Sequence, residues 1–198
     1  MMLAEPLRIT KHVTDVLEQL DIPYLVGGSL ASSLHGIPRA TQDVDVVADL
    51  KYHHIPLLVS AFENEFYIDA DMIREAIKLH SSFNVIHLET MFKVDIFVLQ
   101  EDISSQEEMA RREQYQVSDN PPQTLFLSSA EDVILHKLYW FQLGEGVSER
   151  QWNDVLGVLQ VQHETLDFEY LKRGAKHRGV SQLLEQALSD AELGDKAK

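Results

Sequence analysis

The stretch Tyr24-Leu-Val-Gly-Gly-Ser29, followed by Asp43-Val-Asp-Val-Val-Ala48, decides the fold that this sequence predicts. The first three residues are typical of a short buried strand, and the valines make 43–48 a second strand. Between them, the glycines predict a tight turn that opens a short helix over 29–35. Backbone N–H groups at the start of such a helix attract phosphate. The stretch therefore predicts a strand, an anion-binding turn, a helix and a strand.

The second strand carries two acids, Asp43 and Asp45. Side chains alternate between the faces of a strand, so the two carboxylates point the same way, roughly 7 Å apart. Carboxylates that close repel each other unless a cation neutralises them, and oxygen ligands suit Mg²⁺. The alternative is a pair of solvated acids where a loop becomes a strand. Together with the glycine turn, the pair indicates chemistry on a nucleoside triphosphate.

A third acid, Asp95, interrupts the apolar strand Lys93-Val-Asp-Ile-Phe-Val-Leu99. If this strand neighbours 43–48, Asp95 joins the first two acids on one face. Three carboxylates can hold two Mg²⁺ ions, one activating the attacking hydroxyl and one binding the triphosphate and the leaving pyrophosphate. Asp95 can also accept the proton of the acceptor hydroxyl. The structural alternative is an acid at a strand end, hydrogen-bonded to a neighbour.

The periodicity of the remaining chain predicts a mixed α/β part, residues 1–127, and a helical part, residues 128–193. The break between them falls near Pro121-Pro122. In the first part we expect further helices over 7–20, 51–64 and 70–80, strands over 82–88 and 92–99, and a short helix near 105–114 within a polar segment. In the second part we expect helices over 129–142, 148–161, 166–177 and 180–191.

The composition restricts the class of protein. The 198 residues carry a net charge of −15 and no cysteine. Such a charge argues against broad nucleic-acid binding through phosphate neutralisation, and a chain without cysteine has no disulfide framework. No apolar run approaches the roughly 18 residues of a membrane span, and the N-terminus lacks the pattern of a signal peptide. We therefore expect a cytoplasmic protein with no membrane partner.

These motifs resemble those of a known superfamily. The block Gly27-Gly28-Ser29, then Arg39-x-Thr41-x-Asp43-x-Asp45, then Asp95 on a later strand, is similar to the DNA polymerase β-like nucleotidyltransferases. Two later features, Asp132-x-x-x-x-Lys137 and Asp154, sharpen the resemblance toward the AbiEii/AbiGii-type toxin nucleotidyltransferases and their small relatives.

The resemblance implies a fold and an activity. The fold is α+β, with a nucleotidyltransferase-like mixed β-sheet and flanking helices, followed by a C-terminal helical bundle. The activity is a Mg²⁺-dependent transfer of an NMP from an NTP, ATP among the donors, to the hydroxyl of a tRNA, a protein or a small molecule. A toxin role implies an antitoxin partner. The alternative is a non-catalytic module on the same fold that binds a nucleotide or a partner chain.

The resemblance also implies roles for single residues. Gly27, Gly28 and Ser29 bind the nucleotide, with the last two at the β- and γ-phosphates. Asp43, Asp45 and Asp95 are the catalytic and metal-binding carboxylates. Lys137 contacts the triphosphate as a point charge and also counts as catalytic. Arg39 and Asp154 complete the nucleotide site. The structural alternatives are an ion pair for Arg39, a pairing of Asp154 with Arg150 four residues earlier, and a cap of its own helix for Asp132.

Overall fold

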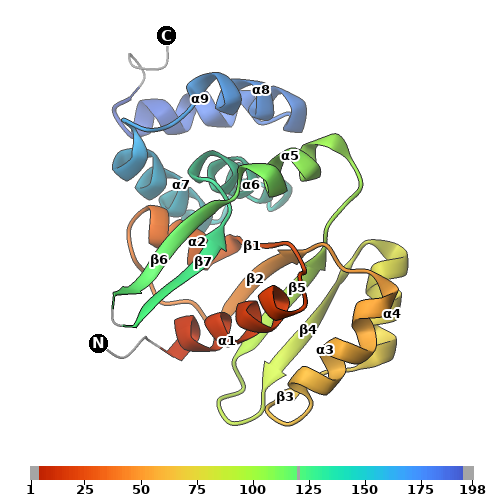
Figure 1. Ribbon diagram of the computed structural model, residues 1–198. Coiled ribbons are helices and arrows are strands. Elements are labelled where there is room, and N and C mark those ends of the chain that lie inside the picture. The colour runs from red at the N-terminus through yellow and green to blue at the C-terminus, as the bar shows by residue number, and fades with distance from the viewer. Residues whose placement is uncertain (1–4, 120, 194–198) are drawn as a thin grey trace. The chain divides into compact units, whose positions relative to one another are not determined.

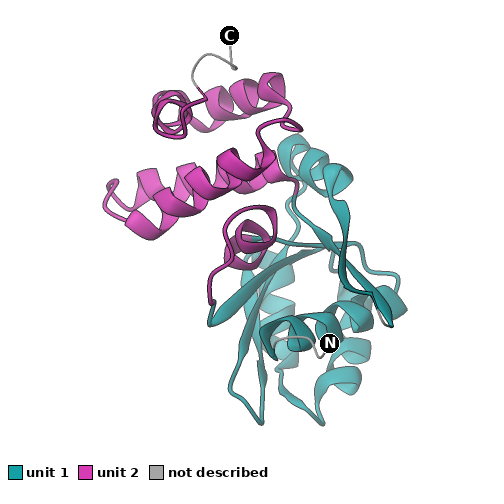
Figure 2. Cartoon of the chain, turned by 90° about the vertical axis from the view of Figure 1, so that its left-hand side faces the viewer, with its two compact units in different colours: residues 1–27, 41–128 teal, residues 28–40, 129–198 magenta. Residues whose placement is uncertain are grey.

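The computed structural model describes residues 5–119 and 121–193. Contacts divide the chain into two compact units (Figure 2). The sheet unit is built from the chain up to Gly27 and from Thr41–Ser128, and the helical unit from Gly28–Ala40 and the chain from Ser129 onward. The segment 28–40 thus groups with the C-terminal helices, whereas the sequence places it in the 1–127 part. That division into two domains stays a prediction.

The sheet unit contains one mixed sheet of seven strands in the order β3-β4-β5-β2-β1-β7-β6 (Figure 1). Strands β2 and β5 run parallel, as do β1 and β7, and the other neighbouring pairs are antiparallel. The bounds are β1 Tyr24–Val26, β2 Asp43–Ala48, β3 Phe66–Tyr67, β4 Ser82–His87, β5 Lys93–Val98, β6 Glu113–Asp119 and β7 Pro122–Leu127.

The two faces of the central strands differ in polarity. Val44 and Val46 of β2 and Val94 and Ile96 of β5 are buried on one face. In front of the sheet in Figure 1 lie helices α1 (Glu5–Gln19), α3 (Ile55–Phe62, after the 3₁₀ turn Tyr52–His54) and α4 (Ala70–Leu79). The opposite face carries Asp43, Asp45 and Asp95. Because side chains alternate along a strand, a buried valine face places the intervening acids on the other side.

Helix α5 (Ile103–Arg111) covers one end of the carboxylate face. Its Met109 packs with Leu25 of β1 and Leu99 after β5, and Val47 of β2 packs against them. Val47 follows Asp45 by two residues and so lies on the same face. The face therefore changes from polar to apolar along β2, which leaves the acids outside the apolar contact under α5.

The helical unit consists of α2 (Gly28–His35), α6 (Ala130–Leu143), α7 (Glu149–Gln162), α8 (Phe168–Arg178) and α9 (Ser181–Asp190). Ala31 of α2 shares one apolar core with residues of the four later helices, among them Leu135, Val158 and Leu171. The four C-terminal helices begin and end within about two residues of the predicted bounds. The α+β fold with a mixed sheet and C-terminal helices is confirmed. None of the described helices combines the length and the hydrophobicity that a membrane crossing requires.

The prediction for residues 100–120 was wrong in one respect. The helix expected near 105–114 begins at Ile103 and ends at Arg111, and a seventh strand, β6, follows it. Strand β6 pairs only with β7, at the sheet edge, and none of its residues is buried. Without a buried apolar face, the sequence shows no alternation that would mark it as a strand.

Candidate active site

The three acids predicted to act together lie in register on neighbouring strands of the sheet unit. Asp45 of β2 pairs directly with Asp95 of the parallel strand β5, and Asp43 pairs with Lys93. Asp43 is exposed, and Asp45 and Asp95 are half-buried. The neighbour relation that the sequence could only assume is therefore confirmed. Thr41 precedes the array, and its hydroxyl donates to the Asp43 carbonyl at 2.8 Å.

Both carboxylate oxygens of Asp95 have partners. Asn84, the cross-strand neighbour on β4, donates its amide Nδ2 to Oδ1 at 2.7 Å. The Lys93 ammonium lies 2.7 Å from Oδ2. The hydrogen bond to Asp95 raises the pKa of Lys93, and the charges of Asp95, Asp43 and Asp45 add to that effect against the opposing effect of burial. Lys93 is thus a cation on the carboxylate face.

The donor set of this face suits a hard divalent cation with part of its coordination supplied from elsewhere. Mg²⁺ prefers carboxylate oxygens and is often held by one or two carboxylates together with water and substrate phosphates. Asp43 and Asp45 provide such a pair. Within residues 5–119 and 121–193, however, no three acidic or histidine side chains converge closely enough to enclose a metal ion by themselves. The face fits a shared magnesium site better than a closed protein cage.

The glycine turn joins the end of β1 to the start of α2. The backbone N–H of Gly27 donates to the Asp45 carbonyl at 2.9 Å, which ties the turn to the strand that carries the carboxylates. Gly28 opens α2 with a φ of 56°. Residues with a Cβ rarely adopt this left-handed conformation, so glycine suits this position. Ser29 follows in the first turn of α2, where N–H groups lack acceptors within the helix.

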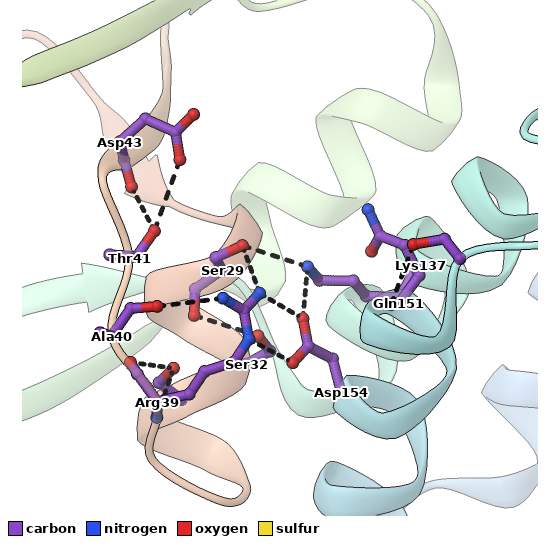
Figure 3. A network of polar contacts seen from close by, with 11 residues as sticks. Ser29, Ser32, Arg39, Ala40, Thr41, Asp43, Lys137, Gln151 and Asp154 are labelled. Atoms are coloured by element: carbon purple, nitrogen blue, oxygen red, sulfur yellow. Dashed lines mark hydrogen bonds and ion pairs between the residues drawn. The ribbon is translucent and has the colours of Figure 1, made fainter.

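Four residues of the helical unit form one polar network around Ser29 (Figure 3). Arg39 donates Nε and Nη2 to the two carboxylate oxygens of Asp154, each at 2.7 Å, and Nη2 also lies 2.7 Å from Ser29 Oγ. From α6, Lys137 Nζ lies 2.8 Å from Asp154 Oδ2 and 3.4 Å from Ser29 Oγ. One carboxylate thus binds both cations beside the serine hydroxyl.

The network is well shielded from solvent. The side chains of Asp154 and Lys137 are only 6% and 7% exposed, and that of Arg39 is 25% exposed. Burial by itself raises the pKa of Asp154, but the hydrogen bonds and charges of Arg39 and Lys137 outweigh it and hold that pKa below its ordinary value. Asp154 is therefore ionised, and it fixes two cations where a phosphate group has similar demands for donors.

The structure decides two of the open assignments. Asp154 contacts Arg39 and Lys137, so Arg39 does form an ion pair, and its acid comes from α7. Asp132 does not provide the cap of α6, because the side chain of Ser129 accepts the N–H of Asp132. The buried Asp132 carboxylate instead accepts hydrogen bonds from the hydroxyls of Ser129 and Tyr170 at 2.8 and 2.7 Å. It links the start of α6 to α8.

Two residues of the carboxylate face were missed at the sequence level, Lys93 and Asn84. Lys93 carries a detectable signal, because it precedes Asp95 by two residues in a strand and so shares its face. Asn84 carries none, since its position depends on the pairing of β4 with β5.

No model of a known protein family matches the sequence, and no curated protein matches it either. Solved structures do match. An antigenic nucleotidyltransferase-like protein from Paracoccidioides brasiliensis is similar with a TM-score of 0.60 at 16% identity, covering 100% of this chain and 95% of that chain. The lincosamide antibiotic adenylyltransferase LnuA, bound to lincomycin, gives a TM-score of 0.53 at 13% identity, covering 80% and 98%. ANT(2'')-Ia in complex with adenylyl-2''-tobramycin gives 0.54 at 14%, covering 88% and 96%.

These similarities define the class of fold. The chain has the nucleotidyltransferase fold, as the sequence motifs predicted. At such low identities the comparison establishes the fold alone, so the activity and the roles of single residues are argued below from the side chains themselves.

Proposed function

We propose that this protein is a Mg²⁺-dependent nucleotidyltransferase that moves an NMP from an NTP to an acceptor hydroxyl and releases pyrophosphate. The observation that carries the proposal is the direct pairing of Asp45 with Asp95, with Asp43 on the same face of adjacent parallel strands. Such a row of acids is costly without a cation. A nucleotide site that uses Mg²⁺ explains why the row is retained.

The helical unit supports the proposal through its phosphate-binding groups. Ser29 lies in the first turn of α2, where free N–H groups and the helix dipole favour an anion. Lys137 and Arg39 place two cations at the Ser29 hydroxyl. In this proposal these groups bind the β- and γ-phosphates of the NTP, and Asp154 keeps the two cations in position.

The proposed reaction is an in-line substitution at the α-phosphorus. The acceptor oxygen forms a bond to this phosphorus, and the bond between it and the bridging oxygen of the β-phosphate breaks. Asp95 accepts the proton of the acceptor hydroxyl. Asp43 and Asp45 hold Mg²⁺, which neutralises phosphate charge when bound. Ser29, Lys137 and Arg39 bind the pyrophosphate as it leaves.

A small-molecule hydroxyl is the acceptor that the overall charge favours. A net charge of −15 opposes binding of a polyanion such as tRNA. Two proteins of the same fold, LnuA and ANT(2'')-Ia, are described with an antibiotic or its adenylylated product bound. The resemblance to AbiEii/AbiGii-type toxins extends the proposal to a tRNA or protein acceptor and a cognate antitoxin. Growth arrest on induced expression, relieved by the neighbouring gene product, tests that extension.

The test compares the wild-type chain with Asp43→Asn. Calorimetry with non-hydrolysable NTP analogues, with and without Mg²⁺, measures binding. Transfer of α-labelled NTP to a panel of aminoglycosides, lincosamides and tRNA measures activity. We expect Mg²⁺-dependent binding of at least one NTP, and a loss of transfer of roughly hundredfold or more in the variant.

Asp49→Asn is the matched control, because Asp49 follows the same strand but pairs with Lys51 at 2.9 Å. It should transfer like the wild type. Full transfer by Asp43→Asn contradicts the metal assignment. Nucleotide binding without transfer to any acceptor favours the non-catalytic nucleotide-binding module instead.

A further inference from the structure

The carboxylate face carries its own cation. Lys93 lies two residues before Asp95 on β5 and pairs in register with Asp43 on β2. Its ammonium lies 2.7 Å from Asp95 Oδ2, while Asn84 binds Asp95 Oδ1. Asp95 is therefore held on both oxygens by groups of this chain. A metal ion that used Asp95 as a ligand would have to displace Lys93, or share an oxygen with it or with Asn84.

The charges of the face lead to the same conclusion. Three carboxylates and one ammonium leave two negative charges, which a single divalent cation neutralises. Asp43 is exposed and Asp45 is half-buried, so this pair is open to such an ion. A second divalent cation would meet a face that already has no net charge.

We propose that Lys93 is a built-in counter-ion that keeps Asp95 out of the metal coordination and limits the nucleotide-free face to one divalent cation, held by Asp43 and Asp45. The inference rests on the proposed function, because it concerns the metal site of that reaction. Lys93 is a positioning residue here. It fixes the Asp95 carboxylate for the acceptor hydroxyl without contacting the substrate.

A plain surface ion pair is the competing explanation. The Lys93 side chain is 39% exposed, and exposed pairs contribute little to stability. A surface pair would affect neither the affinity for a divalent cation nor the number of ions bound. A counter-ion must affect both, because its removal raises the negative charge of the face by one.

The test is calorimetric titration of the full chain, without nucleotide, with Mn²⁺ as the probe for Mg²⁺. Lys93→Met removes the ammonium and keeps an unbranched side chain. We expect this variant to bind the first Mn²⁺ on the order of tenfold more tightly than the wild type, and to take a second equivalent. Lys93→Arg keeps the charge and should titrate like the wild type.

Two further variants separate a local effect from a general one. Lys51→Met breaks a Lys–Asp pair of the same unit, outside the carboxylate face, and should leave Mn²⁺ binding unchanged. The double variant Lys93→Met/Asp95→Asn restores the wild-type charge of the face and should return the affinity to the wild-type value. Thermal melts establish that each variant is folded.

Equal or weaker Mn²⁺ binding by Lys93→Met overturns the inference, as does equal tightening in Lys51→Met. Absence of Mn²⁺ binding in every variant overturns it as well. Transfer by the wild type that is lost in Asp43→Asn upholds the proposed function whatever Lys93→Met shows. The two failures can therefore be told apart.

Discussion

Asp154 shows how one carboxylate can organise a phosphate-binding group. Its two oxygens accept from Arg39 in a bidentate pair, and one of them also contacts Lys137. Such charge-assisted, planar pairs are stronger than ordinary hydrogen bonds and fix geometry. In the absence of a nucleotide, Asp154 compensates two shielded cations that would otherwise repel each other.

Asp154→Asn should destabilise the chain. The amide keeps the shape of the side chain but leaves Arg39 and Lys137 without a compensating charge. We expect a loss of about 2 kcal/mol in the free energy of unfolding, measured by urea denaturation at pH 7. Asp190→Asn is the control, since Asp190 is exposed and accepts only one long hydrogen bond, 3.3 Å from Trp152. An equal loss in both variants contradicts the assignment.

The same pair predicts a pH dependence. The folded state holds the pKa of Asp154 below its ordinary value of about 3.9. The unfolded chain therefore takes up the proton first as the pH falls. The stabilisation is complete above about pH 4 and is lost progressively as the pH falls through the lower, folded-state pKa. The difference in unfolding free energy between wild type and Asp154→Asn should be constant from pH 5 to 7 and shrink below pH 4. A difference that grows on acidification contradicts the direction of the shift.

Residue identity alone predicted which side chains matter better than it predicted their partners. The sequence offered Asp154 a partner four residues away, Arg150, because spacing along one helix is visible in it. The observed partners are Arg39 and Lys137, and only the packing of α2, α6 and α7 brings them together. Lys93 shows the opposite case, since strand alternation was enough to place it beside Asp95.

At the scale of elements, α2 and α7 approach unusually closely. A Cβ added to Gly36, directly after α2, would lie 2.8 Å from backbone atoms of Gly157 and Val158. Backbone cannot rotate away as a side chain can, so one helix would have to shift. Glycine at this position allows α7, which carries Asp154, to lie against α2, which carries Ser29.

Gly36→Ala should therefore destabilise the helical unit. Gly36 has no positive φ, so an alanine would gain slightly from lower chain entropy in the unfolded state. The clash outweighs this gain, and we expect a net loss of about 2 kcal/mol on thermal or urea unfolding. Gly27→Ala is the matched control, because a Cβ there meets nothing within 4 Å and no positive φ is involved. A neutral Gly36→Ala contradicts the close approach.

Elements with a buried face were predictable, and the one without it was not. The four C-terminal helices show apolar residues at helical spacing because each contributes to one core. Strands β2 and β5 alternate because one of their faces is buried. Strand β6, with the sequence Glu113-Gln-Tyr-Gln-Val-Ser-Asp119, is held by backbone pairing to β7, a long-range property that a polar segment does not encode visibly.

At the scale of the whole chain, contacts do not follow the linear order of the sequence. The chain leaves the sheet unit after Gly27 and returns to it at Thr41, so the helix that carries Ser29 belongs to the helical unit. The sequence indicated a break near Pro121-Pro122 because composition changes there. It could not indicate the excursion over 28–40, because a short apolar helix fits equally well against a sheet or in a bundle.

This organisation predicts the behaviour of a fragment that ends at residue 127. Leu30 and Ala31 of α2 are buried, and Ala31 belongs to the core that the C-terminal helices build. In the fragment 1–127 these helices are absent, and isolated eight-residue helices are not stable in water. We expect the amides of 28–35 to exchange with deuterium rapidly in the fragment and slowly in the full chain. The amides of 43–48 and 93–98 should stay protected in both, because the sheet unit contains all their pairing partners. Protection of 28–35 in the fragment would instead assign α2 to the sheet unit, and loss of protection throughout would mean that residues 1–127 do not fold alone.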